Sequence, residues 1–416
     1  MRRAQNGLVV AGAGLAVNLC LGVLYAWGVI SAALIDRLGW TATQTQLPYM
    51  TACACFALSM VPGGRLQDRL GPRPVIVASA LLAGLGFVLS GLTLSVAGLV
   101  MFFGVVFGIG MGLGYAAPTP AAVKWFGPHQ RGVISGVVVS GFGLAPVVMA
   151  PIATALIAAV DLPMTFVIMG VGFLLILLGL SRLIGNPPPG YTPSAPPAKF
   201  RARVPAARDY DWREVLRSKS FYVLWTLFCF GTFAGLLVIG QLSKIGIEQA
   251  GIARPFMLIA IYAISNAGGR VAWGIISDRT GRARSLFAAF VIQLLTYIVF
   301  PALITPFSLA VGIALVGFTF GGMLTLFPAF AADYFGLKNL GVNYGLLITA
   351  WGVGGVFGPL VGGLVRDLTG TYTLSFMASG LLSLMGAAGA LLLPRLRPEA
   401  ADEAGLELAE PLPARP

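Results

Sequence analysis

Residues 64–71 read Gly64-Arg-Leu-Gln-Asp68-Arg69-Leu-Gly71, and the same pattern returns 210 residues later as Gly274-Ile-Ile-Ser-Asp278-Arg279-Thr-Gly281. Each copy lies between two long apolar runs. A second motif repeats at an offset of 209, because Trp125-Phe126-Gly127 corresponds to Tyr334-Phe335-Gly336. Two independent matches at nearly one offset indicate an internal duplication, in which both parts run through the same succession of elements.

The amino-acid composition indicates that these duplicated elements span a membrane. Of the 416 residues, 57% are hydrophobic and 10% are charged, whereas a soluble domain carries about 25% charged residues. A transmembrane helix takes about 20 mostly apolar residues, and runs of this length recur from residue 8 to residue 394. We therefore predict an all-α membrane protein with twelve transmembrane helices in two pseudo-symmetric halves of six. The predicted spans are 8–34, 46–63, 74–93, 97–123, 132–159, 163–184, 220–243, 255–277, 285–304, 307–332, 340–365 and 371–394.

The basic residues lie mainly on one side of the predicted spans. Of the 27 Lys and Arg residues, 22 fall at the termini or in the loops on the same side as the termini. This asymmetry follows the positive-inside rule and predicts a multi-pass protein of the cell (inner) membrane with both termini in the cytoplasm. The net charge of +12 therefore indicates topology in a lipid bilayer, and we expect no nucleic-acid partner.

A polar stretch divides the chain into two bundles. Residues 185–219 hold seven prolines and a basic cluster. We predict that they form an extended cytoplasmic linker between a six-helix bundle over 1–184 and a second one over 220–394. The basic cluster is interpreted as a topology signal near anionic lipid, with a docking site as the alternative. The acidic, proline-containing residues 395–416 are predicted to be a disordered cytoplasmic tail.

The duplicated loop resembles the signature of the major facilitator superfamily, G-x-x-x-D-R-x-G in each half. This resemblance covers residues 5–395 and implies the major facilitator fold, a rocker-switch transporter with a central cavity between its halves. Glycine lets helices approach closely, and the Asp can accept bonds from the N-terminus of a neighbouring helix. The alternative is a turn that only carries topology charges. The residues with an implied gating role are Gly64, Asp68, Arg69, Gly274, Asp278 and Arg279.

One charged residue lies well inside a predicted span. Arg270, in the eighth span, costs at least about 2.5–3.5 kcal/mol at a helix centre, so its presence requires a compensating role. The equivalent position in the first half is Met60, so symmetric packing does not require a cation. Because no Asp or Glu lies in any predicted span, we predict that a substrate carboxylate neutralises the guanidinium. Asn266, on the same helix face, would bind the same ligand. Alternatively, Arg270 extends toward the cytoplasmic surface or is held by helix carbonyls.

This arrangement is similar to the monocarboxylate transporters and the oxalate–formate antiporters of that superfamily, which place a substrate-binding Arg in the eighth span. The short segments that look like this group are Leu24-Tyr25-Ala26-Trp27, Gly114-Tyr115-Ala-Ala-Pro118 and Asn343-Tyr344-Gly345. From this resemblance, Tyr115 is a candidate hydroxyl donor to the carboxylate, with helix packing as the alternative. Leu24 and Phe320 are further candidates for lining the cavity.

Residues that differ from those of this group narrow the choice of substrate. Oxalate exchangers resemble this chain but carry a Lys in the eleventh span, at or near Trp351, and no Lys or Arg lies between Lys338 and Arg366 here. One cation favours one carboxylate, because a dianion would bring an uncompensated charge into an apolar cavity. Trp351 is therefore either the wall of an apolar pocket or an interfacial or packing aromatic. The Asp and Lys of the animal transporters are replaced by Asn266 and, near the Lys position, by Val29, which argues against their Asp–Lys proton relay.

The sequence thus predicts a secondary active transporter of small monocarboxylates, of the lactate or pyruvate class, that works by alternating access. We expect a proton to be co-transported, carried by the substrate or by its complex with Arg270. The alternatives are an exchanger of organic anions and a membrane sensor that binds the same anion without transporting it. No catalytic residue, metal site or cofactor is predicted, because the sequence shows no buried nucleophile, metal-ligand cluster or phosphate loop, and an enzyme is not expected.

Overall fold

The structure, a computed structural model, describes residues 6–193, 208–252 and 256–396. These residues form helices and no strands. Twelve helical segments among them are long and apolar enough to cross a membrane, which confirms the predicted number of spans. The predicted tail 395–416 lies outside the described residues from residue 397 onward.

The first half runs from α1 to α9. Its first span combines α1 Gly7–Leu21, the 3-10 stretch η1 Gly22–Ala26 and α2 Trp27–Leu38. Its fourth span combines α5 Val96–Leu99, the π-helical η2 Val100–Phe107, α6 Gly108–Ala116 and α7 Pro118–Val123. The other helices of this half are α3 Ala42–Leu70, α4 Pro72–Thr93, α8 Arg131–Ala159 and α9 Leu162–Ser181, with the 3-10 turn η3 Pro128–Gln130 before α8.

The second half contains α11 Lys219–Ala250, α12 Phe256–Thr280, α13 Arg282–Val299, η5 Phe300–Ala302, α14 Pro306–Phe335, α15 Leu340–Thr369, α16 Thr373–Ala390 and η6 Leu393–Leu396. Residues 185–219, predicted as an extended linker, include the short helix α10 Trp212–Arg217. A capping box starts this helix. The Asp211 side chain accepts a bond from the N–H of Glu214 at 2.8 Å, and the Glu214 side chain accepts one from the N–H of Asp211 at 2.8 Å.

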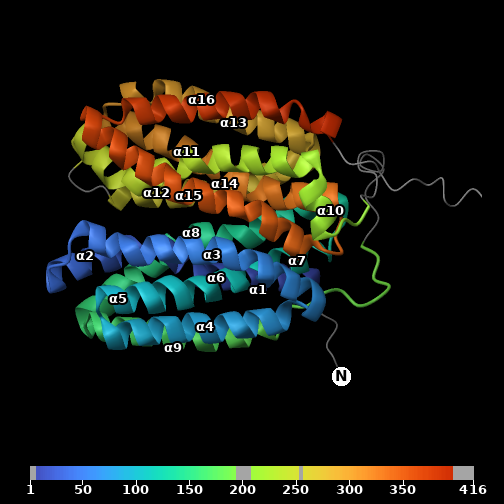
Figure 1. Ribbon diagram of the computed structural model, residues 1–416, viewed down its shortest axis with the longest axis horizontal. Helices are drawn as coiled ribbons and strands as arrows, with labels where there is room; N and C mark the ends of the chain where they lie inside the picture. Colours follow the sequence, from blue (N-terminus) through green and yellow to red (C-terminus); the bar gives the residue numbers. More distant parts are fainter. Residues whose placement is uncertain (1–5, 194–207, 253–255, 397–416) are drawn as a thin grey trace, which may run out of the picture.

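The two halves lie side by side along their helix axes, as Figure 1 shows with the first half in blue and green and the second in yellow to red. They meet along two helix pairs, α3 with α15 and α8 with α12. The internal repeat relates α3 to α12 and α8 to α15, so the two interfaces are pseudo-symmetric copies of each other. Any site at the centre of the molecule therefore lies between these two pairs.

Glycines allow the paired helices to approach closely. A methyl group at Gly136 of α8 would overlap the backbone of Arg270 in α12, and one at Gly345 of α15 would overlap the backbone of Met60 in α3. The partners in these two contacts are related by the repeat offsets of 210 and 209. This equivalence confirms that Met60 occupies the Arg270 position of the first half. The close approach of the two backbones also explains why positions 136 and 345 are glycine.

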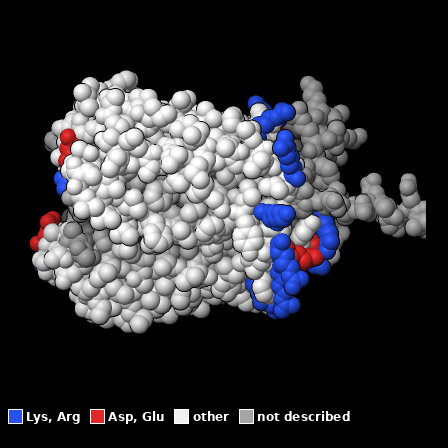
Figure 2. Space-filling model, turned by 45° about the horizontal axis from the view of Figure 1, so that its top comes forward, with Lys and Arg blue, Asp and Glu red and all other residues white. Residues whose placement is uncertain are grey.

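Basic residues gather at one end of the molecule. This end, called the basic end below, contains the C-termini of α3, α12 and α14 and the N-termini of α8 and α15, and Figure 2 shows its band of Lys and Arg side chains. Far fewer charges mark the opposite end in this view. The surface between the two ends in Figure 2 carries no charged side chain, which fits a surface solvated by hydrocarbon chains.

Candidate central anion site

A small closed cavity lies between the two halves, next to Arg270. Its volume is about 10 Å³, which holds about one water molecule and no organic ligand. The structure therefore holds this cavity in a closed form. The residues that line it are Tyr25, Phe56, Tyr115, Phe142, Arg270, Leu324, Ile348 and Trp351.

Arg270 is completely buried, with an exposed fraction of 0%. Its Nε donates to Oδ1 of Asn266 at 2.8 Å, and its Nη1 donates to the carbonyl of Val139 in α8. Its Nη2 has no hydrogen-bond partner among the described residues. Nor does any carboxylate of the described chain form an ion pair with it. The guanidinium is thus held in place by neutral groups, has no carboxylate partner among the described residues, and retains an unused donor.

Aromatic rings form most of the cavity wall. The ring centroid of Phe56 lies 5.4 Å from that of Tyr115 and 5.1 Å from that of Trp351. The centroid of Phe142 lies 4.9 Å from that of Tyr25 and 5.3 Å from that of Tyr115. All four contacts are edge-to-face, the geometry that aromatic pairs prefer. These rings give the cavity an apolar wall next to a single cation.

Four of the six residues predicted to bind the substrate come together here. Arg270, Tyr115 and Trp351 line the cavity, and Asn266 binds the guanidinium from its own helix. Tyr115 lies close enough to Arg270 to interact with it electrostatically. Trp351 packs its ring on Phe56, inside the protein, so it forms part of the pocket wall and not of the lipid interface.

The other two predicted residues, Leu24 and Phe320, are buried but do not line the cavity. Leu24 lies in the 3-10 stretch η1, where the next residue, Tyr25, faces the cavity instead. Phe320 lies inside the second half, where a methyl group at Gly235 would overlap its ring. Both therefore contribute to packing around the site in this structure.

The internal repeat contains a signal for several lining residues that sequence reasoning missed. Phe142 and Trp351 are 209 residues apart, and so are Tyr115 and Leu324. Applying the repeat offset to the predicted residues would have identified Phe142 and Leu324 as lining residues. Phe56 follows in the same way, since it is the first-half equivalent of Asn266. The cavity is thus built from equivalent positions of the two halves, and its one charge breaks this symmetry.

Asp68, near the end of α3, joins the two halves at the basic end. Its carboxylate accepts bonds from the N–H groups of Gly341 at 3.1 Å and Val342 at 2.8 Å, at the start of α15. It thereby satisfies free N–H groups and complements the positive end of the helix dipole. Lys124 lies 3.7 Å from the same carboxylate. Burial lowers the pKa of Lys124, and the negative charge of Asp68 opposes this shift.

Asp278 makes the equivalent contact between α12 and α8. Its carboxylate accepts bonds from the N–H groups of Gly132 at 2.9 Å and Val133 at 2.8 Å. Arg282 binds Asp278 at 2.6 Å and Asp333 at 2.9 Å. Together with the Asp68 contact, these bonds close the basic end between the two halves.

The remaining residues with a predicted gating role divide into two groups. Gly64 and Gly274 are buried, and a methyl group on either would overlap the backbone of a helix in the other half. Arg69 and Arg279 are exposed at the same end of the molecule. The glycines therefore belong to the closed interface, and the arginines face outward from it.

Comparisons with known proteins agree with this architecture. The sequence model of the Major Facilitator Superfamily matches residues 10–301 and 242–416. The chain is 28% identical over 382 residues to the oxalate:formate antiporter of Oxalobacter formigenes. The aligned region covers 90% of this chain and 88% of that protein. It is 26% identical over 404 residues to monocarboxylate transporter 13 of Rattus norvegicus, covering 93% of this chain and 88% of that one. A solved structure, the human organic anion transporter MFSD10, has a similar fold, with a TM-score of 0.70 at 15% identity over 92% of this chain and 98% of that chain.

Proposed function

This chain belongs to the Major Facilitator Superfamily and is a multi-pass membrane transporter, and from this premise we propose that its cargo is a small monocarboxylate. One observation carries the proposal: the buried guanidinium of Arg270 has an unused donor and no carboxylate partner among the described residues. A buried charge without a counter-charge is strongly destabilising. A carboxylate matches the guanidinium in shape and charge, so binding the cargo removes this cost.

The rest of the cavity favours one carboxylate over two. Its lining residues other than Arg270 are aromatic or aliphatic. A second carboxylate would lose its hydration without meeting a second cation, which is costly. A lactate or pyruvate molecule combines one carboxylate with a small body that fits against rings such as Trp351 and Phe142. The likeness to a monocarboxylate transporter supports the same class of cargo.

The bond between Arg270 and Val139 links cargo binding to the motion of the halves, because it joins α12 to α8. A carboxylate competes with the Val139 carbonyl for the guanidinium, since bonds between two charged groups are stronger than bonds to a neutral carbonyl. The cavity of about 10 Å³ must also expand to admit the cargo. Binding thus favours separation of the halves, and alternating access follows when either end can open. The basic end is closed in this structure, and we place it in the cytoplasm.

A proton is expected to accompany the cargo, carried by the carboxylic acid or by its complex with Arg270. The likeness to an oxalate:formate antiporter favours exchange of organic anions as the second candidate function. Reconstituted protein distinguishes the two. Symport predicts uptake into empty vesicles that increases when the outside is made more acidic than the lumen. Exchange predicts uptake only into vesicles preloaded with an anion.

Uptake of labelled lactate or pyruvate into proteoliposomes tests the central residue. Arg270→Gln removes the charge and keeps polar atoms, and Arg270→Lys keeps the charge without the bidentate geometry. A charged hydrogen-bonded partner contributes about 1.5–3 kcal/mol, so Arg270→Gln should lower kcat/KM roughly tenfold to a hundredfold. Arg73→Gln, an exposed arginine at the basic end, serves as the matched control and should retain uptake. Full uptake by Arg270→Gln would exclude the proposed role.

A further inference from the structure

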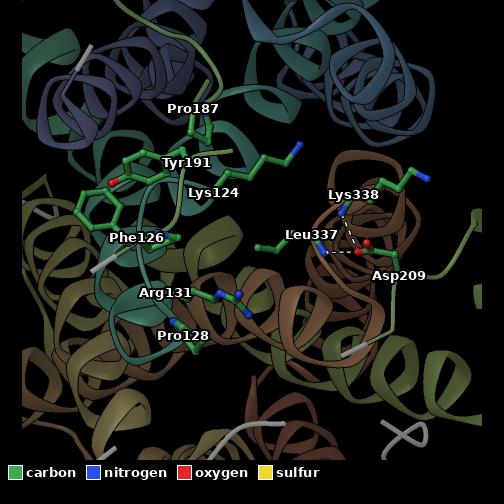
Figure 3. Close-up of a pocket in the computed structure, with 11 residues that line it drawn as sticks. Lys124, Phe126, Pro128, Arg131, Pro187, Tyr191, Asp209, Leu337 and Lys338 are labelled. Carbon is green, nitrogen blue, oxygen red and sulfur yellow. Dashed lines mark hydrogen bonds between the residues drawn. The ribbon is translucent and has the colours of Figure 1, made fainter. Parts of the chain in front are cut away.

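A second and much larger cavity opens at the basic end. Its volume is about 450 Å³, and Figure 3 shows the residues around it. Its walls come from the loop after α7, from the chain on either side of 194–207, and from the loop between α14 and α15, so both halves contribute. Its charged lining residues are Lys124, Arg131, Asp209 and Lys338.

The charged side chains of this cavity are mostly basic. Lys124 and Arg131 come from the first half and Lys338 from the second, and Figure 3 shows the Lys338 side chain extending away from Lys124 and Arg131. Lys124 forms an ion pair with Asp68 of the same half, with 3.7 Å between the charged atoms. Lys338 is exposed and forms no ion pair with any described carboxylate.

The one carboxylate in the lining indicates how an anion binds here. Oδ1 of Asp209 accepts bonds from the backbone N–H groups of Leu337 at 2.9 Å and Lys338 at 3.0 Å. These N–H groups follow Gly336, whose φ of +80° is strained for other residues. The turn after α14 is therefore a backbone anion-binding turn that an oxygen of the chain itself already occupies. The Asp209 carboxylate forms no hydrogen bond or ion pair with the side-chain ammonium group of Lys124 or of Lys338.

We propose that this cavity binds a phosphate group, either free phosphate or the terminal phosphate of a lipid headgroup, between Lys124 and Arg131 of one half and Lys338 of the other. A tetrahedral anion has several acceptor oxygens, so it can bind several charged donors at once. Arg131 also binds Asp333 of the second half at 3.1 Å, so the anion would add to an existing contact between the halves. Because the two halves supply opposite walls, separating them at the basic end would remove the site.

The consequence is a coupling between anion binding and the state of the transporter. A ligand that binds only when the basic end is closed stabilises the closed form by its binding free energy. The site lies outside the central cavity and shares no lining residue with it. The inference therefore does not depend on the identity of the transported cargo.

Binding of inorganic phosphate to the purified full-length protein tests the proposal. Titration calorimetry in neutral detergent, at constant ionic strength with chloride as the exchanged anion, should show saturable binding. Lys338→Gln should weaken this binding about tenfold or more, since it removes one charged donor. Arg73→Gln is the matched control at the same end, and Arg270→Gln controls for the central cavity. Both should bind phosphate as the unmodified protein does.

A second arm distinguishes the two sources of the phosphate group. Nanodiscs that contain phosphatidic acid are compared with nanodiscs that contain only zwitterionic lipid, and the melting temperature is measured for the unmodified protein and for Lys338→Gln. A stabilisation that requires phosphatidic acid and Lys338, without binding of free phosphate, assigns the site to a lipid headgroup. The proposal is overturned if neither source binds, or if Lys338→Gln binds both as tightly as the unmodified protein.

Discussion

Arg270 illustrates how one side chain decides the chemistry of an otherwise apolar site. Its first-half equivalent, Met60, occupies the same place in the pseudo-symmetric packing and carries no charge. The pseudo-symmetric packing therefore does not require a cation at this position. Asn266 and the Val139 carbonyl fix its orientation without neutralising it. We propose that the binding partner that it lacks is the anion of the cargo.

A second cation in the same cavity should change the preferred cargo. Trp351 lines the cavity together with Arg270, and Trp351→Lys would place an ammonium group there. We expect the variant to prefer a dicarboxylate such as oxalate, because two cations neutralise two carboxylates. Competition of unlabelled oxalate and lactate against labelled substrate in proteoliposomes measures the preference, with Trp351→Phe as the control for loss of the indole. An unchanged ratio of the two affinities in Trp351→Lys would contradict this reading of the site.

We expect the helix pairs α3–α15 and α8–α12 to form the moving interface, with their glycines setting how closely the basic end can close. In α12, a methyl group at Gly274 would overlap the backbone of Gly132, whereas one at Gly268 would meet open space. Two alanine substitutions in one helix therefore give a matched pair. A difference in behaviour between the two alanine variants reports on closure of the basic end and not on the stability of α12 itself.

We expect Gly274→Ala to open the basic end and Gly268→Ala to leave it closed. Overpacking of this kind costs about 1–3 kcal/mol, so the open population should rise roughly fivefold to a hundredfold. The reporter is Ser135→Cys in α8, a position that is fully buried in the closed form. It is introduced after replacement of the native Cys20, Cys53, Cys55 and Cys229. Equal rates of maleimide labelling in the two alanine variants would show that this contact does not control closure.

We expect the basic end to set the orientation of the whole molecule in the membrane. Exposed positions at the two ends provide the test, Arg69 at the basic end and Asp36 at the end of α2. In the same cysteine-free background, Arg69→Cys should react with an impermeant maleimide only from the cytoplasmic side, and Asp36→Cys only from the outside. Whole cells and inverted vesicles separate the two sides. The reverse labelling pattern would invert the proposed topology.

The whole architecture was accessible from sequence because length and hydropathy alone determine membrane spans, and because the duplication is visible in short motifs. The same repeat showed that the first-half equivalent of Arg270 is the uncharged Met60. Other details depend on information that residue types do not carry. The bond to Val139 uses a backbone carbonyl, which leaves no mark in the sequence. The 3-10 stretch η1 changes the helical phase, so that Tyr25 and not Leu24 faces the cavity.

The most direct test of the central claim is the binding of a monocarboxylate to the purified protein. Calorimetric titration with lactate, pyruvate and oxalate should show saturable binding of at least one monocarboxylate, with weaker binding of oxalate. Arg270→Gln should lose this binding by roughly tenfold or more, because the charged partner is gone. If Arg270→Gln binds the same monocarboxylate as tightly as the unmodified protein, the buried guanidinium is not the anion site and the proposed cargo is wrong.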